Sequence, residues 1–371
     1  MNRSEIIGSG MSQKNILEFC LSPDLGGLEL FMVNCYENFK EKTTCKLVIE
    51  EGKQLDSWIE DTSKIHLKRN RFFPLLPALK LAQVIDKHEI DIIHFHWTKD
   101  IITVVLGKLL SKRKPKIIQT RHMMMTRFKD DVYHRWLYKN VDILHAVTYQ
   151  VKEQLVKFVP QEIRPKLEML YIGTEELIVN QNRVDELRLE YALEESFVVG
   201  IVGRIEERKG QYLLIEAMAR LKEFDIKALI VGQTMDEVYS LELQEKVKTL
   251  GLEDRVIFTG FTKEVDSFMQ LFDINVLATQ KETFGLVVIE AMMNKVCMIA
   301  TNNGGPLEII ENGKDGLLFN RTSEDLAAKI RWLYKDRAYK KRMALAGYKT
   351  AKEKFDSQIQ LEKLFKVINE S

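Results

Sequence analysis

Two glutamates, Glu282 and Glu290, have a spacing that could serve chemistry in this chain of 371 residues. The residues between them end in the apolar run Leu286–Ile289. That run predicts a helix packed against a sheet, with Glu282 in the preceding loop and Glu290 about two turns further along. Free amides of the first turn, from Phe284 to Val287, would attract a phosphate, and carboxylates beside them would repel it unless they bind other groups, such as sugar hydroxyls. The stretch therefore indicates a nucleotide-sugar site, although a buried helix whose glutamates only reach water fits the spacing equally well.

A second group of charged residues follows the apolar stretch Phe197–Val202, which predicts a buried strand. Gly203-Arg204 comes directly after it, and Lys209-Gly210 precedes a predicted helix that begins at Gln211. Arg can hold a phosphate through a fork of donors, and Lys adds a compact positive charge. A merely solvated loop would not explain why Arg204 directly ends a buried strand. We therefore expect Arg204 and Lys209 to bind phosphate.

Two adjacent glycines, Gly26 and Gly27, follow the first predicted strand, Lys14–Cys20, and open a helix. Glycines at such a turn let the backbone approach a ligand closely. An ordinary tight turn between a strand and a helix explains the pair at least as well. The sequence has no Gly-x-Gly-x-x-Gly here, so it does not predict a dinucleotide fingerprint.

Histidines end two further predicted strands of the first half, Asp91–Trp97 and Ile117–His122. Ligands of open α/β sheets collect beyond the carboxyl ends of strands. We therefore expect His96 to lie where a ligand would, and His94 to be a core residue. His122 is the best candidate of this half for contacting the reacting group, and a structural role in capping its strand is the competing interpretation.

Strands and helices alternate along the whole chain, which predicts two α/β domains with parallel sheets. The pattern breaks near Ile172–Glu176. We therefore predict a first domain over residues 1–174 and a second over residues 175–354. A last amphipathic helix, residues 355–371, is expected to pack back on the first domain.

The composition, with 45% hydrophobic and 29% charged residues and a net charge of +1, is typical of a soluble globular protein. No apolar run approaches the roughly 20 residues needed to span a bilayer, and the N-terminus lacks the apolar core of a secretory signal. These features predict a cytoplasmic protein. The cysteines lack the spacing of metal ligands, so we interpret them as small core residues; they are Cys20, Cys35, Cys45 and Cys297.

Positive charge gathers in the first half, which has no acidic residue from Thr62 to Ile85 or from Ile101 to Lys129. Phe72, Phe73 and Leu75 lie close to the basic stretch 64–71. We therefore hypothesise a contact with the anionic inner face of the cytoplasmic membrane. A merely solvated basic face is an equally good interpretation. Nothing in the sequence indicates a nucleic-acid partner.

Taken together, these motifs resemble the family 4 retaining glycosyltransferases, which have the GT-B architecture. The matching elements occur in order across nearly the whole chain: Gly26-Gly27-x-Glu29, His94-x-His96, Thr120-x-His122, Gly203-Arg204 with Lys209-Gly210, Glu282-x7-Glu290 and Gly304-Gly305-x-x-Glu308. The resemblance implies two Rossmann-like, doubly wound parallel-sheet domains that face a central cleft. One departure is Ile172-Gly173, where many relatives have Asn-Gly.

The resemblance also implies roles for the candidate residues. Arg204 and Lys209 would hold the diphosphate of a nucleotide sugar and stabilise it as the leaving group. Glu290 would accept hydrogen bonds from the ribose hydroxyls. Glu282 would contact the donor sugar, aided by amides near Phe284, Gly285 and Leu286. Gly26 and Gly27 would lie near the diphosphate and acceptor. His122 would face the donor sugar.

The implied reaction moves a sugar, with its anomeric configuration retained, from a donor for which UDP is the default to a hydroxyl of a glycan or lipid-linked acceptor. Bacterial cell-surface polysaccharide, lipopolysaccharide and glycolipid synthesis are the expected settings. The sequence has no Asp-x-Asp, so we expect neither a metal nor another cofactor. The alternatives are a carboxylate-pair hydrolase, which leaves Arg204 and Lys209 without a role, and a sugar-nucleotide-binding protein or epimerase of the same fold.

Overall fold

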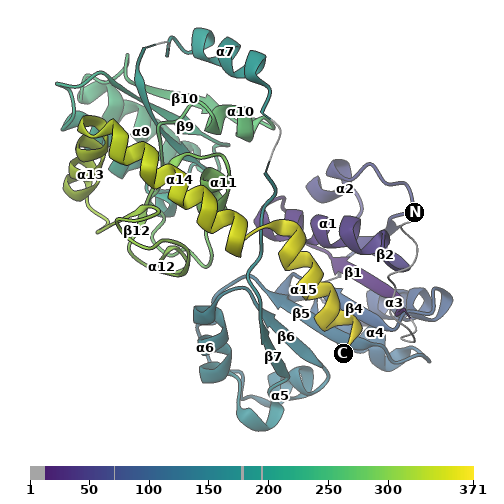
Figure 1. Ribbon diagram of the computed structural model, residues 1–371. Coiled ribbons are helices and arrows are strands. Elements are labelled where there is room, and N and C mark those ends of the chain that lie inside the picture. Colours follow the sequence, from purple (N-terminus) through teal and green to yellow (C-terminus); the bar gives the residue numbers. More distant parts are fainter. Residues whose placement is uncertain (1–12, 71, 177–178, 194) are drawn as a thin grey trace, which may run out of the picture. The chain divides into compact units, whose positions relative to one another are not determined.

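The computed structural model describes residues 13–70, 72–176, 179–193 and 195–371. They form two compact units, each with its own sheet and helices (Figure 1). The first unit contains the described residues up to Leu170 together with Leu361–Ser371, and the second contains Tyr171–Gln360. The predicted architecture of two α/β domains with parallel sheets is confirmed.

The first unit is built on a seven-stranded parallel sheet in the order β3-β2-β1-β4-β5-β6-β7. Its five inner strands are almost entirely buried, which explains their mostly apolar sequences, whereas the edge strands β3 and β7 are partly exposed. The order reverses between β1 and β4, so the loops after these two strands diverge there. The strands are β1 Ile16–Cys20, β2 Cys45–Ile49, β3 Ile65–His66, β4 Ile92–Phe95, β5 Lys116–Arg121, β6 Ile143–Ala146 and β7 Lys166–Met169.

The helices of the first unit include the one that begins at Gly27, as the glycine pair predicts. They are α1 Gly27–Lys40, α2 Gln54–Trp58, α3 Leu75–Lys87, α4 Ile101–Leu110, α5 Val132–Lys139 and α6 Tyr149–Phe158. The C-terminal helix α15, Ser357–Asn369, contributes its later residues to this unit. Its Phe365 ring lies 5.3 Å from the Phe39 ring of α1.

The second unit has a six-stranded parallel sheet in the order β10-β9-β8-β11-β12-β13, which reverses between β8 and β11. The strands are β8 Phe197–Val202, β9 Ile226–Val231, β10 Val256–Gly260, β11 Ile274–Leu277, β12 Cys297–Thr301 and β13 Leu317–Phe319. The helices are α7 Gln181–Glu190, α8 Gln211–Ala219, α9 Glu237–Thr249, α10 Val265–Met269, α11 Leu286–Met293, α12 Pro306–Ile309, α13 Ser323–Lys335 and α14 Arg337–Lys354.

Helix α11 is the helix predicted after Glu282, and it packs apolar side chains into the second unit. Val288 and Ile289 are fully buried. It begins only at Leu286, because residues 282–285 form a loop that ends in Gly285 at φ 102°. Glu290 therefore lies just over one turn into the helix, not about two turns. Among the described residues, no helix is long and apolar enough to cross a bilayer.

Candidate functional site

Three loops at the carboxyl edge of the second sheet are joined by their backbones. They follow the neighbouring strands β8, β11 and β12 and are called here the β8/β11/β12 loops: residues 203–210, 278–285 and 302–305. The amide of Gln280 donates to the carbonyl of Arg208 at 2.8 Å, and the amide of Gly305 donates to that of Glu282 at 3.0 Å. The motifs predicted to act together therefore lie in one place, at the reversal of strand order where ligands of such sheets bind.

Glycines allow these loops to pack backbone against backbone. A Cβ atom at Gly210 would lie 2.5 Å from the carbonyl oxygen of Ala278. At Gly304 it would lie 2.0 Å from the carbonyl oxygen of Glu282, and at Gly305 2.1 Å from that of Phe284. Gly210 and Gly304 also have φ values of +76° and +65°, which disfavour other residues. Gly304 and Gly305, which belong to the motif Gly304-Gly305-x-x-Glu308, thus pack against the loop that contains Glu282.

Positive charge exceeds negative charge at these loops. Lys209 Nζ lies 3.5 Å from Glu282 Oε2, and Arg204 Nε lies 3.6 Å from Glu206 Oε1. Burial alone would raise the pKa of Glu206, but a hydrogen bond from Arg208 and the charges of Arg208, Arg204 and Lys209 lower it. The Arg204 side chain remains 44% exposed. Its guanidinium is therefore available to an anion from solvent.

Backbone amides beside Glu282 also lack a hydrogen-bond acceptor among the described residues. Within the described part of the chain, the amides of residues 283–287 donate no hydrogen bond to another residue. The Phe284 side chain is buried, and its ring lies 6.0 Å from that of Tyr171. Phe284 can therefore offer a ligand only its backbone. These amides and the start of α11 give the loop an anion-binding character.

Glu290 is a half-buried carboxyl group with no hydrogen bond or ion pair to any other described residue. Burial, together with the negative charge of Asp266 on α10, raises the pKa of Glu290 to about 7. Such a group gains from a ligand that donates hydrogen bonds to it.

In the first unit, His122 directly follows β5 and is half-buried. Burial and the neighbouring histidines hold its pKa well below the ordinary value. The Phe31 ring of α1 packs edge-on 5.4 Å from the imidazole. Arg121 folds the following loop by donating to the carbonyls of Met123 at 2.8 Å and Met124 at 3.2 Å. The imidazole position is therefore defined from both sides.

The expectation that His96 meets a ligand is wrong, because its side chain is only 1% exposed. Its Nε2 lies 2.8 Å from Glu18 Oε2, and the buried carboxylate draws the imidazole into the core. His94 is a core residue, as predicted, with its Nδ1 2.8 Å from Glu18 Oε1. The sequence motifs did not include Glu18, although a carboxylate within the apolar strand Ile16–Cys20 indicates a buried polar contact.

Gly26 caps α1 in an extended conformation, with φ −160°. A Cβ atom there would meet only the Glu29 carboxylate, at an ordinary contact distance of 3.5 Å. Packing within the first unit therefore does not require glycine at this position. A requirement for glycine would have to come from a ligand.

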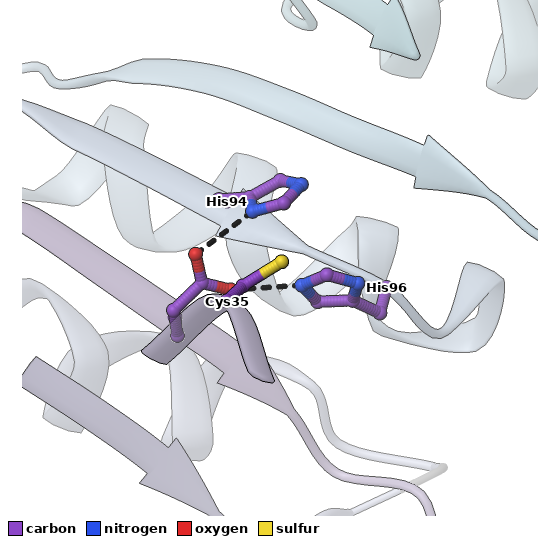
Figure 2. Close-up of side chains that lie close together, drawn as sticks. Cys35, His94 and His96 are labelled. Carbon is purple, nitrogen blue, oxygen red and sulfur yellow. Dashed lines mark hydrogen bonds and ion pairs between the residues drawn. The ribbon is translucent and has the colours of Figure 1, made fainter. Parts of the chain in front are cut away.

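One buried group contains the side-chain types that bind metals: Glu18, Cys35, His94 and His96 (Figure 2). Their donor atoms all lie within 4.8 Å of one another. All four cysteines are buried, as predicted. Spacing in the sequence did not suggest the group, because its members come from β1, α1 and β4.

Comparison with known proteins identifies relatives of both halves. Residues 184–350 match the family model described as glycosyl transferases group 1, and residues 18–150 match that described as glycosyl transferase 4-like. The N-acetyl-alpha-D-glucosaminyl L-malate synthase of Bacillus anthracis is 28% identical over 253 residues, which are 66% of this chain and 65% of that protein. The capsular polysaccharide biosynthesis glycosyltransferase CapM of Staphylococcus aureus is 24% identical and covers 89% of this chain and 90% of its own.

A solved structure of HepE from Anabaena in complex with UDP-glucose has the same fold, with a TM-score of 0.85 at 20% identity. The match covers 96% of this chain and 100% of that one.

Proposed function

Because the chain belongs to the group 1 glycosyltransferases and has the GT-B fold, we propose that it moves a sugar from a nucleotide-sugar donor to a hydroxyl group of a glycan or lipid-linked acceptor, with retention of anomeric configuration. The observation that carries the proposal is that free backbone amides, Lys209 and Arg204 all lie in the β8/β11/β12 loops. These groups suit a diphosphate, and the carboxylates beside them suit hydroxyl groups.

Arg204 and Lys209 hold the diphosphate in this proposal. The bond between the anomeric carbon and the phosphate oxygen breaks, and a bond forms from that carbon to the acceptor oxygen. The acceptor proton passes to a phosphate oxygen of the departing nucleotide. The main term to stabilise is the negative charge that develops on this phosphate, and preplaced cations and amides supply that stabilisation. These groups do the work that a divalent cation does in other phosphate-leaving reactions, so the proposal requires no metal.

The two glutamates bind different hydroxyl groups. Glu290 accepts hydrogen bonds from the ribose, which gives its unpartnered carboxyl the donors it lacks. Glu282 is held by Lys209 and binds the donor sugar. Amides of Phe284, Gly285 and Leu286 support the sugar and the phosphate. Equal roles as a hydrolase pair fit less well, because Glu282 has a cation partner and Glu290 has none among the described residues.

The proposal also gives roles to residues of the first unit. Gly26 and Gly27 lie near the diphosphate and acceptor in this proposal, and a Cβ atom at Gly26 would meet only the Glu29 carboxylate, so packing within the first unit does not require glycine there. His122 faces the donor sugar. We favour UDP as the nucleotide because HepE is a structural neighbour solved with UDP-glucose. The name of CapM supports a role in bacterial cell-surface polysaccharide synthesis.

A membrane contact of the first unit is a further part of the proposal. Phe72 is 81% exposed and Phe73 is 68% exposed, and the exposed Leu75 and Leu76 follow at the start of α3. The basic residues contribute less than their number suggests, since Lys64 pairs with Asp56 and Lys108 with Asp142; Arg71 lies outside the described residues. Insertion of the two phenylalanines at an anionic surface would bury the largest exposed apolar side chains of this stretch.

Flotation with vesicles that contain phosphatidylglycerol tests the membrane contact. The double variant Phe72→Ser with Phe73→Ser should lose binding, whereas Leu241→Ser, which changes an apolar residue of α9 that is 63% exposed, should keep it. Failure of the native protein to float even at low salt would contradict the contact.

Incubation with labelled UDP-, GDP- and ADP-sugars and a bacterial glycolipid extract tests the reaction. A transferase yields a labelled acceptor, an epimerase yields an altered donor, and a binding protein yields neither. Lys209→Ala and Glu282→Ala should each reduce transfer by about 10²–10³-fold. Lys248→Ala and Glu245→Ala on the exposed face of α9 are the matched controls. Near-normal turnover by either site variant would contradict the assigned site.

A further inference from the structure

A chain of buried hydrogen bonds runs through the first unit, from the carbonyl of Leu170 to His122. Leu170 is the last residue of the unit before the backbone enters the second. The links cross β6, β5, β4 and β1, and three of the histidines that they join, His94, His96 and His145, are at most 1% exposed. Because water does not reach the four inner links, the donor and acceptor at each of them must be settled within the protein.

The direction of the chain is fixed at its Leu170 end. A carbonyl only accepts, so His145 Nε2 donates to it at 2.8 Å. Burial lowers the pKa of His145 to about 3, so the ring is neutral and its Nδ1 has a lone pair. The Thr120 hydroxyl donates to that nitrogen at 2.9 Å. Its oxygen can therefore only accept from His94 Nε2, at 2.7 Å.

Glu18 of β1 links His94 of β4 to His96, which directly follows that strand, and the two dashed lines of Figure 2 mark these contacts. One proton lies between His94 Nδ1 and Glu18 Oε1. Burial alone would raise the pKa of Glu18, but the charge and hydrogen bond of His94 and the hydrogen bond from His96 lower it. Oε2 is therefore an acceptor, and His96 Nε2 donates to it at 2.8 Å.

His122 is the last link. His96 has a pKa lowered to about 4 by burial, so it is neutral, and its Nδ1 has the lone pair. His122 Nε2 lies 3.3 Å from that nitrogen and must donate to it. His122 is itself neutral, so its own Nδ1 has no proton. The imidazole thus offers a hydrogen-bond acceptor at Nδ1.

We propose that Glu18 is a positioning residue that acts through His96 to hold His122 as the Nε2–H tautomer, so that Nδ1 accepts a hydrogen bond from a hydroxyl group of the donor sugar. The sugar contact rests on the function proposed above, whereas the tautomer does not. A histidine without this chain would exchange between tautomers, and a substrate hydroxyl would meet a donor part of the time.

The same cluster could be interpreted as a metal site, but its atoms already have partners. Both oxygens of Glu18 and both nitrogens of His94 and His96 take part in the chain. Cys35 has no part in these hydrogen bonds, and burial raises the pKa of its thiol well above the ordinary value.

Nitrogen-15 NMR of the full chain labelled at histidine tests the tautomer, with His122→Gln used to assign the signal. The proposal expects a protonated Nε2 and an unprotonated Nδ1 at neutral pH. An Nδ1–H signal for His122 would overturn it, as would one bound metal ion per chain after purification without added metal.

Two variants of Glu18 separate positioning from mere packing. Glu18→Gln can still accept from His96 through its oxygen and donate to His94 Nδ1 through its amide, so the His122 signal should not change. Glu18→Leu removes the acceptor, so His122 should show both tautomers and turnover should fall on the order of tenfold, the usual effect of one lost hydrogen bond.

Calorimetric UDP affinity should be the same in both variants, because the proposed nucleotide contacts lie in the second unit. A His122 signal altered by Glu18→Gln would overturn the positioning role even if Glu18→Leu does not fold. An Nε2–H tautomer in a protein that transfers no sugar would instead count against the proposed function.

Discussion

Glu18 and Glu290 are two carboxyl groups removed from water in different units, and they end in opposite electrostatic states. Glu18 is completely enclosed, yet its two histidine partners hold its pKa below the ordinary value. Glu290 is half-buried, and burial together with the negative charge of Asp266 raises its pKa to about 7, which no cation or donor among the described residues offsets. Partners, more than depth, decide the charge of a buried carboxyl. A satisfied carboxylate stabilises structure, whereas an unsatisfied one marks a place for a ligand.

The largest difference between the two carboxyls should be in stability. Glu18→Leu leaves the donors of His94 and His96 without an acceptor and should lower the free energy of unfolding of the first unit by about 3–5 kcal/mol. Glu290→Gln should not lower that of the second unit at neutral pH, because it breaks no contact and removes the cost of ionising a carboxyl whose pKa is raised to about 7. Urea denaturation followed by hydrogen exchange reports each unit separately. Similar losses for both variants would contradict the comparison.

Ligand binding should show the reverse order. Glu290→Gln should weaken UDP binding by about 10–100-fold, the range expected for a lost hydrogen bond to a charged group. Glu18→Gln should leave UDP binding unchanged. Isothermal titration calorimetry measures both, with Glu245→Gln as the control on α9. If the Glu290 variant binds UDP as tightly as the native protein, Glu290 does not bind the ribose.

Acidification should affect the two units in opposite directions. The folded first unit resists protonation of His96, whose pKa is about 4 against 6.5 in the unfolded chain, so its stability should fall as the pH drops from about 6.5 to 4. The lowered pKa of Glu18 removes further stability once the pH falls below its ordinary value of 4.5. Glu290 favours the folded state below 4.5, and this contribution is lost as the pH rises through about 7.

The fluorescence of a Trp332→Phe variant checks the acid response, because the other three tryptophans, Trp58, Trp97 and Trp136, all lie in the first unit. Urea midpoints at several pH values should fall on the acid side. A first unit that gains stability between pH 6.5 and 4 would disprove the assigned neutral state of His96.

The smallest effect should follow changes aimed at a metal. Cys35→Ala removes a buried thiol that has no place in the hydrogen-bond chain, and should cost the first unit only about 1 kcal/mol of stability. Dialysis against EDTA should change neither its thermal midpoint nor the NMR signal of His122. A clear fall in the thermal midpoint after EDTA would show that Glu18, Cys35, His94 and His96 bind a metal. Glu18 would then not be a carboxylate satisfied by histidines alone, and the contrast with Glu290 would fail.

Most elements and the residues of the β8/β11/β12 loops were predictable, because their signals are local. Apolar runs specified the buried strands, and glycines marked the turns that follow them. Arg204, Lys209 and Glu282 could be expected to meet because parallel strands place their carboxyl ends at one edge of a sheet. The late start of α11 was not predictable. It depends on Gly304 and Gly305, which pack against the Glu282 loop from another strand.

The sequence by itself determined the fold class, the family and the cationic loops, since these depend on the order and spacing of residues along the chain. Only the tertiary structure decided the roles of Glu18 and His96. Their hydrogen bonds join β1 to β4 across 78 residues of sequence, and that distance leaves no periodic signal. Only the tertiary structure also distinguished the pKa of Glu18 from that of Glu290. A pKa responds to the charges and donors that folding brings within a few ångströms, not to the residues beside it in sequence.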